Sequence, residues 1–455
     1  MTWKTYSIAQ IIEDVQSGFA CGNKDVVNGF LHLRMNNIHS DGKLDLTLLR
    51  RVPPELVGSK YRLKKGDVVV CTTNSGKLVG KSALFDIEGE YAFSNHLTRL
   101  RLKKDIAEPT FVQKLFWLKW QLGEIEPLCK HWVNQSTLPK DALLALEFQL
   151  PPLVEQRRIA RKLDRIAAQL DEVKARLATI PSLLKRFRQS ILATACSGRL
   201  TNDWRNQKGR DIEPALVVIE KIRLKLIQAT CSVSDRRKLI SILDLLPIIP
   251  GLDAGLPENW VACSIGSIGY VTNGSTPSRK MSEYWNGDIP WVSSGEVKNS
   301  IISSTRERIS QKGYDNSSVR MLPKGTVLLA MIGEGKTRGQ TAIINISSCI
   351  NQNVAAVVID HGFVLAKYLW FWFQGQYESN REAGSGSGPQ ALNCQRVREL
   401  PFHLPPLNEQ VEIVRRVEEL MSQADAIEAR YNKAMVFVDK LMPSILAKAF
   451  RGELA

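Results

Sequence analysis

The chain contains the same stretch of sequence twice, 254 positions apart. Residues 150–156 read Leu-Pro-Pro-Leu-Val-Glu-Gln, and residues 404–410 read Leu-Pro-Pro-Leu-Asn-Glu-Gln. At the far end of each copy, residues 190–193 and 444–447 both read Ser-Ile-Leu-Ala, and the alignment between these points needs no gap. Such a register indicates one duplicated unit rather than two unrelated helices.

Both copies carry apolar residues at alternating steps of four and three. This spacing predicts long coiled-coil helices, each roughly 60 Å in length at about 1.5 Å per residue. Pro181 and Pro443 lie within the pattern, and we expect a bend at each. The predicted seam consists of Ile159, Leu163, Ile166, Leu170, Val173 and Leu177 in the first copy and Ile413, Val417, Leu420, Ile427, Tyr431 and Val438 in the second.

The regions before the two helices also resemble each other, but only in framework. Trp260-x3-Ser264-Ile265 repeats Trp3-x3-Ser7-Ile8, and Gly335-Lys336-x2-Gly339 repeats Gly76-Lys77-x2-Gly80. We therefore predict an α/β protein in which two mixed α/β modules are separated by two long antiparallel helices, with approximate twofold internal symmetry. The predicted boundaries are 1–150 for the first module, 151–200 for the first helix, 201–254 for a helical extension and linker, 255–404 for the second module and 405–455 for the second helix.

The net charge of +15 favours a polyanionic partner. Residues 151–200 hold eleven Lys/Arg against four Asp/Glu, whereas residues 405–455 hold seven against eight. A solvated coiled-coil face, a DNA backbone contact and an acidic partner subunit all remain open for the basic residues of the first helix. The eight cysteines are scattered singly, which is typical of reduced thiols, and no apolar run approaches 18 residues. We expect a cytoplasmic protein without a membrane segment.

No catalytic motif withstands scrutiny. Gly80-Lys81-Ser82 resembles a phosphate-binding loop but lacks the glycine that the loop requires at position 75, which is Ser75. Asp315, Glu334 and Lys336 loosely fit a metal-dependent nuclease pattern, yet the first module has Ser75 in place of Glu334. We expect a non-catalytic chain that holds no metal or cofactor. The rival hypotheses are a self-sufficient Mg-dependent endonuclease using Glu334 and Lys336, and a coiled-coil scaffold with no role on DNA.

The duplicated Leu-Pro-Pro-Leu-x-Glu-Gln stretch resembles the specificity subunits of type I restriction–modification systems. So do residues 180–189, residues 444–454, and the opening of the second module at Gly274-Ser275-Thr276-Pro277 and residues 284–292. The resemblance covers essentially the whole chain and is strongest to the enteric, IA-like branch.

This resemblance implies a subunit with two target-recognition domains, each reading one half of a split sequence in double-stranded DNA. It further implies two docked methyltransferase subunits that bind S-adenosylmethionine, and two motor–nuclease subunits that use ATP and Mg²⁺. The complex would be a type I site-specific deoxyribonuclease and adenine-N6 DNA methyltransferase that defends against foreign DNA. A rigid spacer between two basic modules agrees with that architecture, because a spacer enforces the separation of half-sites.

Recognition residues vary within the family, so we chose candidates from polar and basic side chains in glycine-bounded loops. Arg suits guanine, and Asn or Gln suits adenine, through paired hydrogen bonds. The candidates are Arg34, Asn36, Asn37, Lys77, Lys81, Asn95 and His96 in the first module and Arg279, Lys280, Ser293, Lys336, Arg338, Asn351 and Gln352 in the second.

Overall fold

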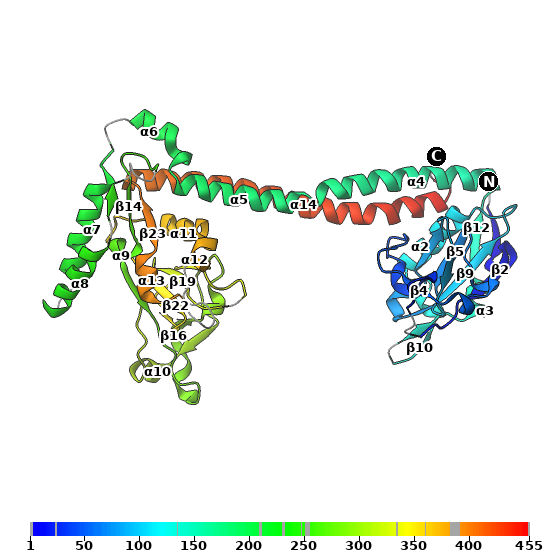
Figure 1. The fold of residues 1–455 in the computed structure, drawn as a ribbon, viewed down its shortest axis with the longest axis horizontal. Helices are drawn as coiled ribbons and strands as arrows, with labels where there is room; N and C mark the ends of the chain where they lie inside the picture. The colour runs from blue at the N-terminus through cyan, green and yellow to red at the C-terminus, as the bar shows by residue number, and fades with distance from the viewer. Residues whose placement is uncertain are drawn as a thin grey trace. The chain divides into compact units, whose positions relative to one another are not determined.

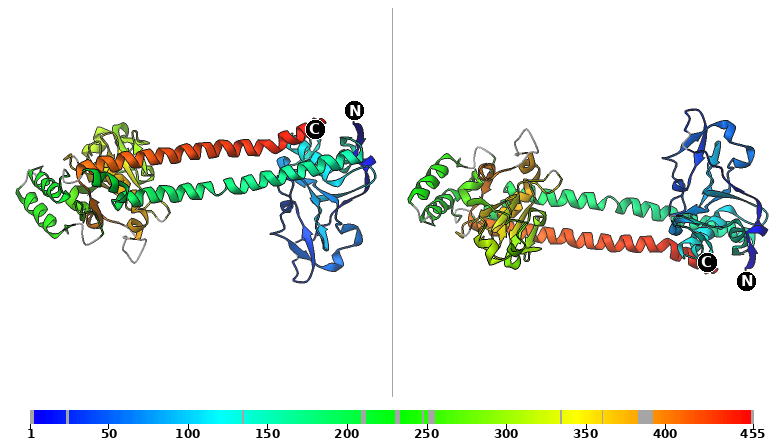
Figure 2. Two further views of the ribbon diagram at one scale, coloured as in Figure 1. Left: turned by 90° about the horizontal axis from the view of Figure 1, so that it is seen from above. Right: turned by 90° about the horizontal axis from the view of Figure 1, so that it is seen from below.

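A computed structural model describes residues 3–22, 25–133, 135–208, 212–229, 233–246, 248–250, 255–333, 335–359, 361–382 and 392–453. The chain forms two compact units. Unit 1 comprises residues 1–179 and 430–455, and unit 2 comprises residues 180–429. Each unit therefore contains one module together with a part of both long helices (Figures 1 and 2).

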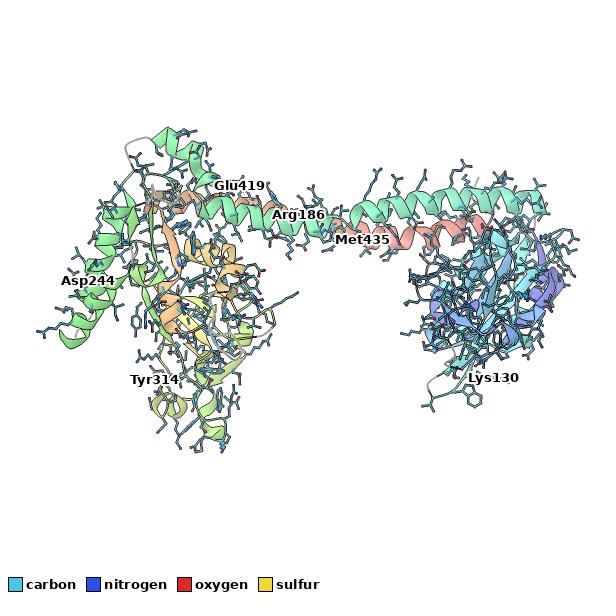
Figure 3. All side chains as sticks on the ribbon, in the orientation of Figure 1. Lys130, Arg186, Asp244, Tyr314, Glu419 and Met435 are labelled. Carbon is cyan, nitrogen blue, oxygen red and sulfur yellow. The ribbon has the colours of Figure 1, made fainter. Side chains whose placement is uncertain are left out.

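The module of unit 1 is built on a four-stranded antiparallel sheet in the order β2 (Ile12–Ser17), β9 (Leu97–Leu102), β5 (Asp67–Cys71) and β7 (Ser82–Phe85). Two three-stranded sheets accompany it, β4 (Arg50–Val52), β3 (Phe30–Leu33) and β8 (Tyr91–Phe93), and β10 (Lys130–His131), β11 (Ser136–Thr137) and β6 (Thr73–Asn74). Its helices are α1 (Ile8–Ile11), α2 (Pro109–Gln121) and α3 (Lys140–Ala145). Lys130 lies at the end of this module that is remote from the long helices (Figure 3).

The module of unit 2 has a five-stranded sheet in the order β15 (Tyr270–Asn273), β22 (Val354–Val358), β19 (Val327–Ala330), β20 (Thr341–Ile344) and β17 (Ser300–Ile302). A three-stranded sheet contains β18 (Glu307–Ile309), β16 (Trp285–Val292) and β21 (Cys349–Ile350). Its helices are α9 (Ile265–Ile268), α10 (Gln311–Asp315), α11 (Ala366–Gly375), α12 (Tyr377–Glu382) and α13 (Cys394–Glu399). The mixed α/β character expected of both modules is confirmed.

The two modules begin and end in the same way, as their sequences indicate. In unit 1, β1 (Lys4–Ser7) pairs antiparallel with β12 (Glu147–Leu150); in unit 2, β14 (Val261–Ser264) pairs antiparallel with β23 (Pro401–Leu404). The aligned glycines also share a backbone conformation, since φ is 93° at Gly80 and 84° at Gly339. Glycine adopts this region without the strain that a side chain would cause, so the two modules share one glycine turn at this place.

The first long helix is not continuous, which corrects the expectation of one helix over 151–200. Two residues, 178 and 179, separate the end of α4 (Leu153–Leu177) from the start of α5 (Ile180–Cys196). Pro181 has no N–H to donate to the Leu177 carbonyl, so the helix stops before the proline. The second long helix, α14 (Leu407–Phe450), continues through Pro443 as a single element.

Ion pairs show that the helices run antiparallel within each unit. In unit 1, Lys174 of α4 binds Asp439 of α14 at 2.9 Å. In unit 2, Arg188 of α5 binds Asp425 at 2.6 Å and Glu428 at 2.7 Å. In unit 2, Thr201, which follows α5, also binds Glu409, so the partner numbers fall along α14 as they rise along the first long helix, which is the antiparallel register. The seam is buried at Ile159, Leu163, Ile413, Val417 and Val438 but exposed at Val173 and Ile427.

Each module packs its core against both long helices. In unit 1, α2 and the main sheet bury Ile159 and Leu163 of α4 together with Leu446 of α14. In unit 2, α11 and the five-stranded sheet bury Ile191 of α5 together with Ile413 of α14. The helices are therefore part of each module's hydrophobic core.

The segment 201–254, which the sequence predicts to be a helical extension and linker, is helical over much of its described part. It forms α6 (Asn202–Lys208), α7 (Ala215–Ala229) and α8 (Val233–Leu245), and α7 buries Ala215, Ile219 and Ile222 in the core of unit 2. β13 (Ile249–Pro250) then pairs with β14, so this part of the predicted linker belongs to the second module.

A duplicated glutamine ties each module to its long helix. In unit 1, the Gln156 amide donates to the Ile106 and Pro151 carbonyls, both at 2.9 Å, and accepts from the Glu108 N–H at 2.9 Å. In unit 2, Gln410 donates to the Phe363 and Pro405 carbonyls at 3.1 and 3.0 Å and accepts from the Leu365 N–H at 2.8 Å. Each side chain thereby satisfies backbone groups that flank a module helix, α2 or α11.

Replacing Gln156 with leucine should destabilise unit 1 by about 2–4 kcal/mol, because three backbone groups then lose their partner inside the protein. Chemical denaturation of the Gln156→Leu variant measures this free energy of unfolding. Gln169→Leu is the matched control, since Gln169 is an exposed residue of the same helix. Equal stability of the two variants would contradict the assigned role.

Candidate nucleic-acid interface

In each module, a short turn directly follows the central strand of a three-stranded sheet, β3 in unit 1 and β16 in unit 2. In unit 1, β3 leads into a turn in which the Arg34 N–H donates to Asn37 Oδ1 at 2.8 Å. In unit 2, β16 leads into a turn in which the Ser293 N–H donates to Glu296 Oε2 at 2.9 Å. The same cap geometry is thus built from different side chains.

A second turn lies beside the first in both modules, because the strands that carry the two turns are parallel. β3 pairs in parallel with β8, and β16 pairs in parallel with β21. The Ser94 N–H donates to the Leu33 carbonyl at 2.9 Å, and the Asn351 N–H donates to the Val292 carbonyl at 3.0 Å. The carboxyl ends of parallel strands meet at one edge of a sheet, so both turns emerge together.

A third segment crosses this edge at a glycine. A Cβ atom on Gly18 would stand 2.2 Å from the Phe93 carbonyl oxygen, and one on Gly274 would stand 1.8 Å from the Ile350 carbonyl oxygen. Both distances are far below van der Waals contact, so only glycine fits. Three chain segments therefore converge at equivalent places in the two modules. They are the turns after Leu33 and Phe93 and the crossing at Gly18 in unit 1, and the turns after Val292 and Ile350 and the crossing at Gly274 in unit 2. We call each of these two places a reading edge.

In unit 1 the reading edge is hollowed into a cleft of about 540 Å³. Four of the seven residues predicted for this module line it, namely Arg34, Asn36, Asn95 and His96. The side chains of Asn36 and Asn95 are exposed, so their amides are accessible from solvent. The structure thus brings together residues that are up to 62 positions apart in the sequence.

The wall of this cleft carries buried polar atoms. Ser94 Oγ and Arg34 Nε are buried without a hydrogen-bond partner among the described residues. Burial first, and the charge of Arg34 second, lower the pKa of His32 to about 4, so this imidazole is neutral at physiological pH. Buried polar groups without partners in the protein are suited to bind a polar ligand.

The reading edge of unit 2 has different chemistry. Ser293 replaces Arg34, and Gln352 replaces Asn95 as the exposed side chain of the second turn. The Gln352 Oε1 accepts a hydrogen bond of 2.5 Å from Thr276 Oγ1, which orients its amide. Asn351 is buried and takes the place of Ser94. The sequences of the two first turns have nothing in common, but their backbones are equivalent.

Two predicted residues of the first module support the cleft from within. Lys81 is only 7% exposed, and its ammonium group donates to the Ile38 carbonyl and to the Met35 carbonyl, the latter at 3.4 Å. Asn37 is buried and donates to the Asp45 carbonyl at 2.8 Å. Both side chains hold the turn after β3 in place, because their polar atoms are used inside the module.

The other predicted residues lie outside the reading edges. Lys77 and Lys336 are exposed on the equivalent glycine turns, and Arg338 is half-buried on the same turn as Lys336. Arg279 is engaged by both carboxylate oxygens of Glu307, and its guanidinium carbon lies 3.8 Å from the centre of the Trp285 ring. Lys280 is exposed beside it. The sequence alone did not distinguish these residues from those that line the cleft.

Sequence reasoning missed His32 and Arg50 as cleft residues. The two are brought together because β3 and β4 pair antiparallel with His32 opposite Arg50. No local motif links positions 18 residues apart. Only the strand pairing of β3 with β4 supplies that signal.

The described residues contain no group of three or more His, Cys, Asp or Glu that is arranged to hold a metal ion. Glu334, which the nuclease hypothesis requires, lies outside the described residues. Asp315 accepts a hydrogen bond of 2.7 Å from Gln311 within α10. In the same part of the chain, no helix is long and apolar enough to span a membrane. The reading edges carry hydrogen-bond donors and acceptors.

Comparison with known proteins identifies the family. The family model of the type I restriction modification DNA specificity domain matches residues 57–182 and 257–434. The StySPI specificity subunit of Salmonella potsdam is 29% identical over 427 residues, covering 93% of this chain and 82% of that protein. The EcoBI specificity subunit of Escherichia coli is 31% identical over 342 residues, covering 71% and 60%.

Solved structures share the fold. The HsdS subunit from Thermoanaerobacter tengcongensis matches with a TM-score of 0.62 at 18% identity, covering 100% of this chain and 97% of that one. A chain from a study of complex assembly and conformational transition of the type I R-M system matches with a TM-score of 0.67, also at 18% identity, covering 100% and 98%. The chain therefore belongs to the specificity subunits of type I restriction–modification systems.

Proposed function

We propose that this chain reads a split, asymmetric DNA target for a type I restriction–modification complex, with one half-site read by each module. The observation that carries the proposal is the pair of reading edges, which share a backbone but differ in side chains. Arg34, Asn36 and Asn95 at one edge, and Ser293 and Gln352 at the other, select different bases through different donors and acceptors.

Contacts to the DNA backbone are a second element of the proposal. Arg157, Arg161 and Arg165 are exposed along α4, in the stretch whose net charge is eleven minus four, or +7. Guanidinium groups suit phosphates, and such contacts fix position without specifying sequence. We assign these arginines to the phosphate backbone, while base recognition belongs to the reading edges.

Exposed apolar side chains recur at equivalent positions of the two long helices. In unit 1, Val173 is 42% exposed and Phe437 is 65% exposed; in unit 2, Ile427 is 46% exposed and Leu183 is 51% exposed. The repeat of 254 residues relates Val173 to Ile427 and Leu183 to Phe437. Exposed apolar side chains that recur in this way support two copies of one partner, which we take to be the methyltransferase subunit.

The chemistry of the complex then belongs to the partners. We assign S-adenosylmethionine to two methyltransferase subunits, and ATP and Mg²⁺ to two motor–nuclease subunits. This chain contributes recognition and spacing, in the cytoplasm where the complex meets DNA. The nuclease and scaffold alternatives have no supporting observation in the described residues.

Replacing Asn36 with alanine should relax base discrimination in one half-site only. Asn36 is exposed at the reading edge of unit 1, and one good paired contact contributes about 1–3 kcal/mol of discrimination. A randomised DNA library methylated by the assembled complex measures discrimination at each position. Asn345→Ala is the matched control, because Asn345 is exposed away from the reading-edge segments. Equal loss in both half-sites would contradict separate reading.

Lengthening both long helices together should change the gap between the half-sites. Seven residues inserted after Thr179 and after Lys433 add about 10 Å of helix, which corresponds to about three base pairs. These positions are 254 apart and lie opposite one another in the register set by Lys174 and Asp439. The half-site bases should stay the same in the methylated motif. If the half-site bases changed while the gap stayed the same, the proposal that the long helices set the spacing would be contradicted.

A further inference from the structure

A β-hairpin of unit 1 exposes two apolar side chains at the end of the module that is remote from the long helices (Figure 3). Its strands β10 and β11 pair antiparallel, and the Trp132 N–H donates to the Gln135 carbonyl at 2.8 Å, which closes the turn between them. The Trp132 side chain is 70% exposed, and that of Val133 is 99% exposed. An indole gains free energy when it leaves water, so this tip is suited to contact another molecule.

Backbone hydrogen bonds join this hairpin to the reading edge of unit 1. β11 pairs with β6, and the N–H of Thr73 in β6 donates to the His96 carbonyl at 3.2 Å. His96 lines the cleft of that edge. Neighbouring strands lie about 5 Å apart, so β11 and β10 stand roughly 10–15 Å from His96, a distance of about three or four base pairs along a duplex.

The charge of the hairpin favours a polyanion as the molecule that it contacts. Lys130 and His131 form β10, directly before Trp132, and both are exposed. The hairpin, residues 130–137, contains no Asp or Glu. A cation beside an exposed indole suits DNA, because the phosphates lie on either side of the stacked bases.

The second module has no aromatic residue at the corresponding place in its sequence. α3 and α13 begin 254 residues apart, which is also the offset of the long helices. By that offset, residues 130–135 correspond to residues 384–389, which read Gly-Ser-Gly-Ser-Gly-Pro and lie outside the described residues. The exposed indole is therefore a feature of the first module and not of the repeat.

We propose that Trp132 is a wedge that inserts between adjacent base pairs at the border of the first half-site. The proposal rests on the proposed reading of DNA, and it adds a residue that distorts the duplex instead of reading base edges. Apolar wedges partially unstack a base step and kink the duplex, and the kinked DNA contacts more of the protein surface. In this arrangement Val133 contacts the same step and Lys130 binds a flanking phosphate.

Fluorescence of 2-aminopurine tests the wedge in the complete complex of this chain with its methyltransferase subunits. The probe occupies successive positions within about four base pairs of the half-site that Asn36→Ala assigns to unit 1, except the methylated adenine, because methyltransferases extrude their target base. The wild-type complex should raise the fluorescence at one position, where the base is unstacked. Trp132→Ala should abolish this rise and weaken target binding about five- to a hundredfold, whereas Trp132→Phe should retain most of both. No such rise should occur beside the other half-site.

Leu122→Ala is the matched control, because Leu122 is 60% exposed in the same module but lies outside the hairpin. This variant should leave both the fluorescence and the binding unchanged. If the wild-type complex gives no rise at any position, or if the rise persists in Trp132→Ala, the wedge is overturned, while specific binding by both complexes leaves the reading function in place. Loss of the methyltransferase subunits from Trp132→Ala, seen as a lower mass in light scattering, would also overturn it, because the hairpin would then be a protein contact. A wild-type complex that binds no specific target contradicts the proposed function and the wedge with it.

Discussion

The attachment of each module to the long helices depends on a buried glutamine. Gln156 and Gln410 occupy the same position in the repeat and make the same three hydrogen bonds to backbone groups beside α2 or α11. Buried backbone groups are costly to leave unpaired, so this contact tolerates little change. It accounts for the gapless match of the two helical stretches, because each copy must receive its module in the same geometry.

The side chains that are free to differ between the two modules are the exposed ones at the reading edges. At the reading edges, the parallel pairs β3–β8 and β16–β21 fix where two turns emerge, while the exposed side chains contribute little to the core. Asn95 and Gln352 can therefore differ without cost to the fold. An attachment that tolerates little change, combined with turns that can vary, suits a DNA-reading subunit, because the sequence that is read can change while each module keeps its attachment to the long helices.

The sequence predicted the features that depend on local periodicity and on the repeat. The buried part of the coiled-coil seam, the shared glycine turns at Gly80 and Gly339, and the two α/β modules all followed from such patterns, whereas Val173 and Ile427 of the predicted seam are exposed. The cleft did not, because it depends on pairing between distant strands, as between His32 and Arg50. The burial of Lys81 was also hidden, since a lysine in a glycine-bounded loop is usually solvated. The first long helix breaks before Pro181 instead of bending there. Proline lacks the N–H that a helix interior needs, but it is tolerated in the first turn of a helix, where α5 places it.

The central claim is that the two modules read two different half-sites held at a fixed separation. Long-read sequencing of DNA from cells that carry this chain with its methyltransferase partner tests it most directly. The account predicts one motif with two unlike halves, separated by a fixed number of unread bases and carrying one N6-methylated adenine in each half, on opposite strands. A palindromic motif, or a continuous motif without a gap, would contradict it.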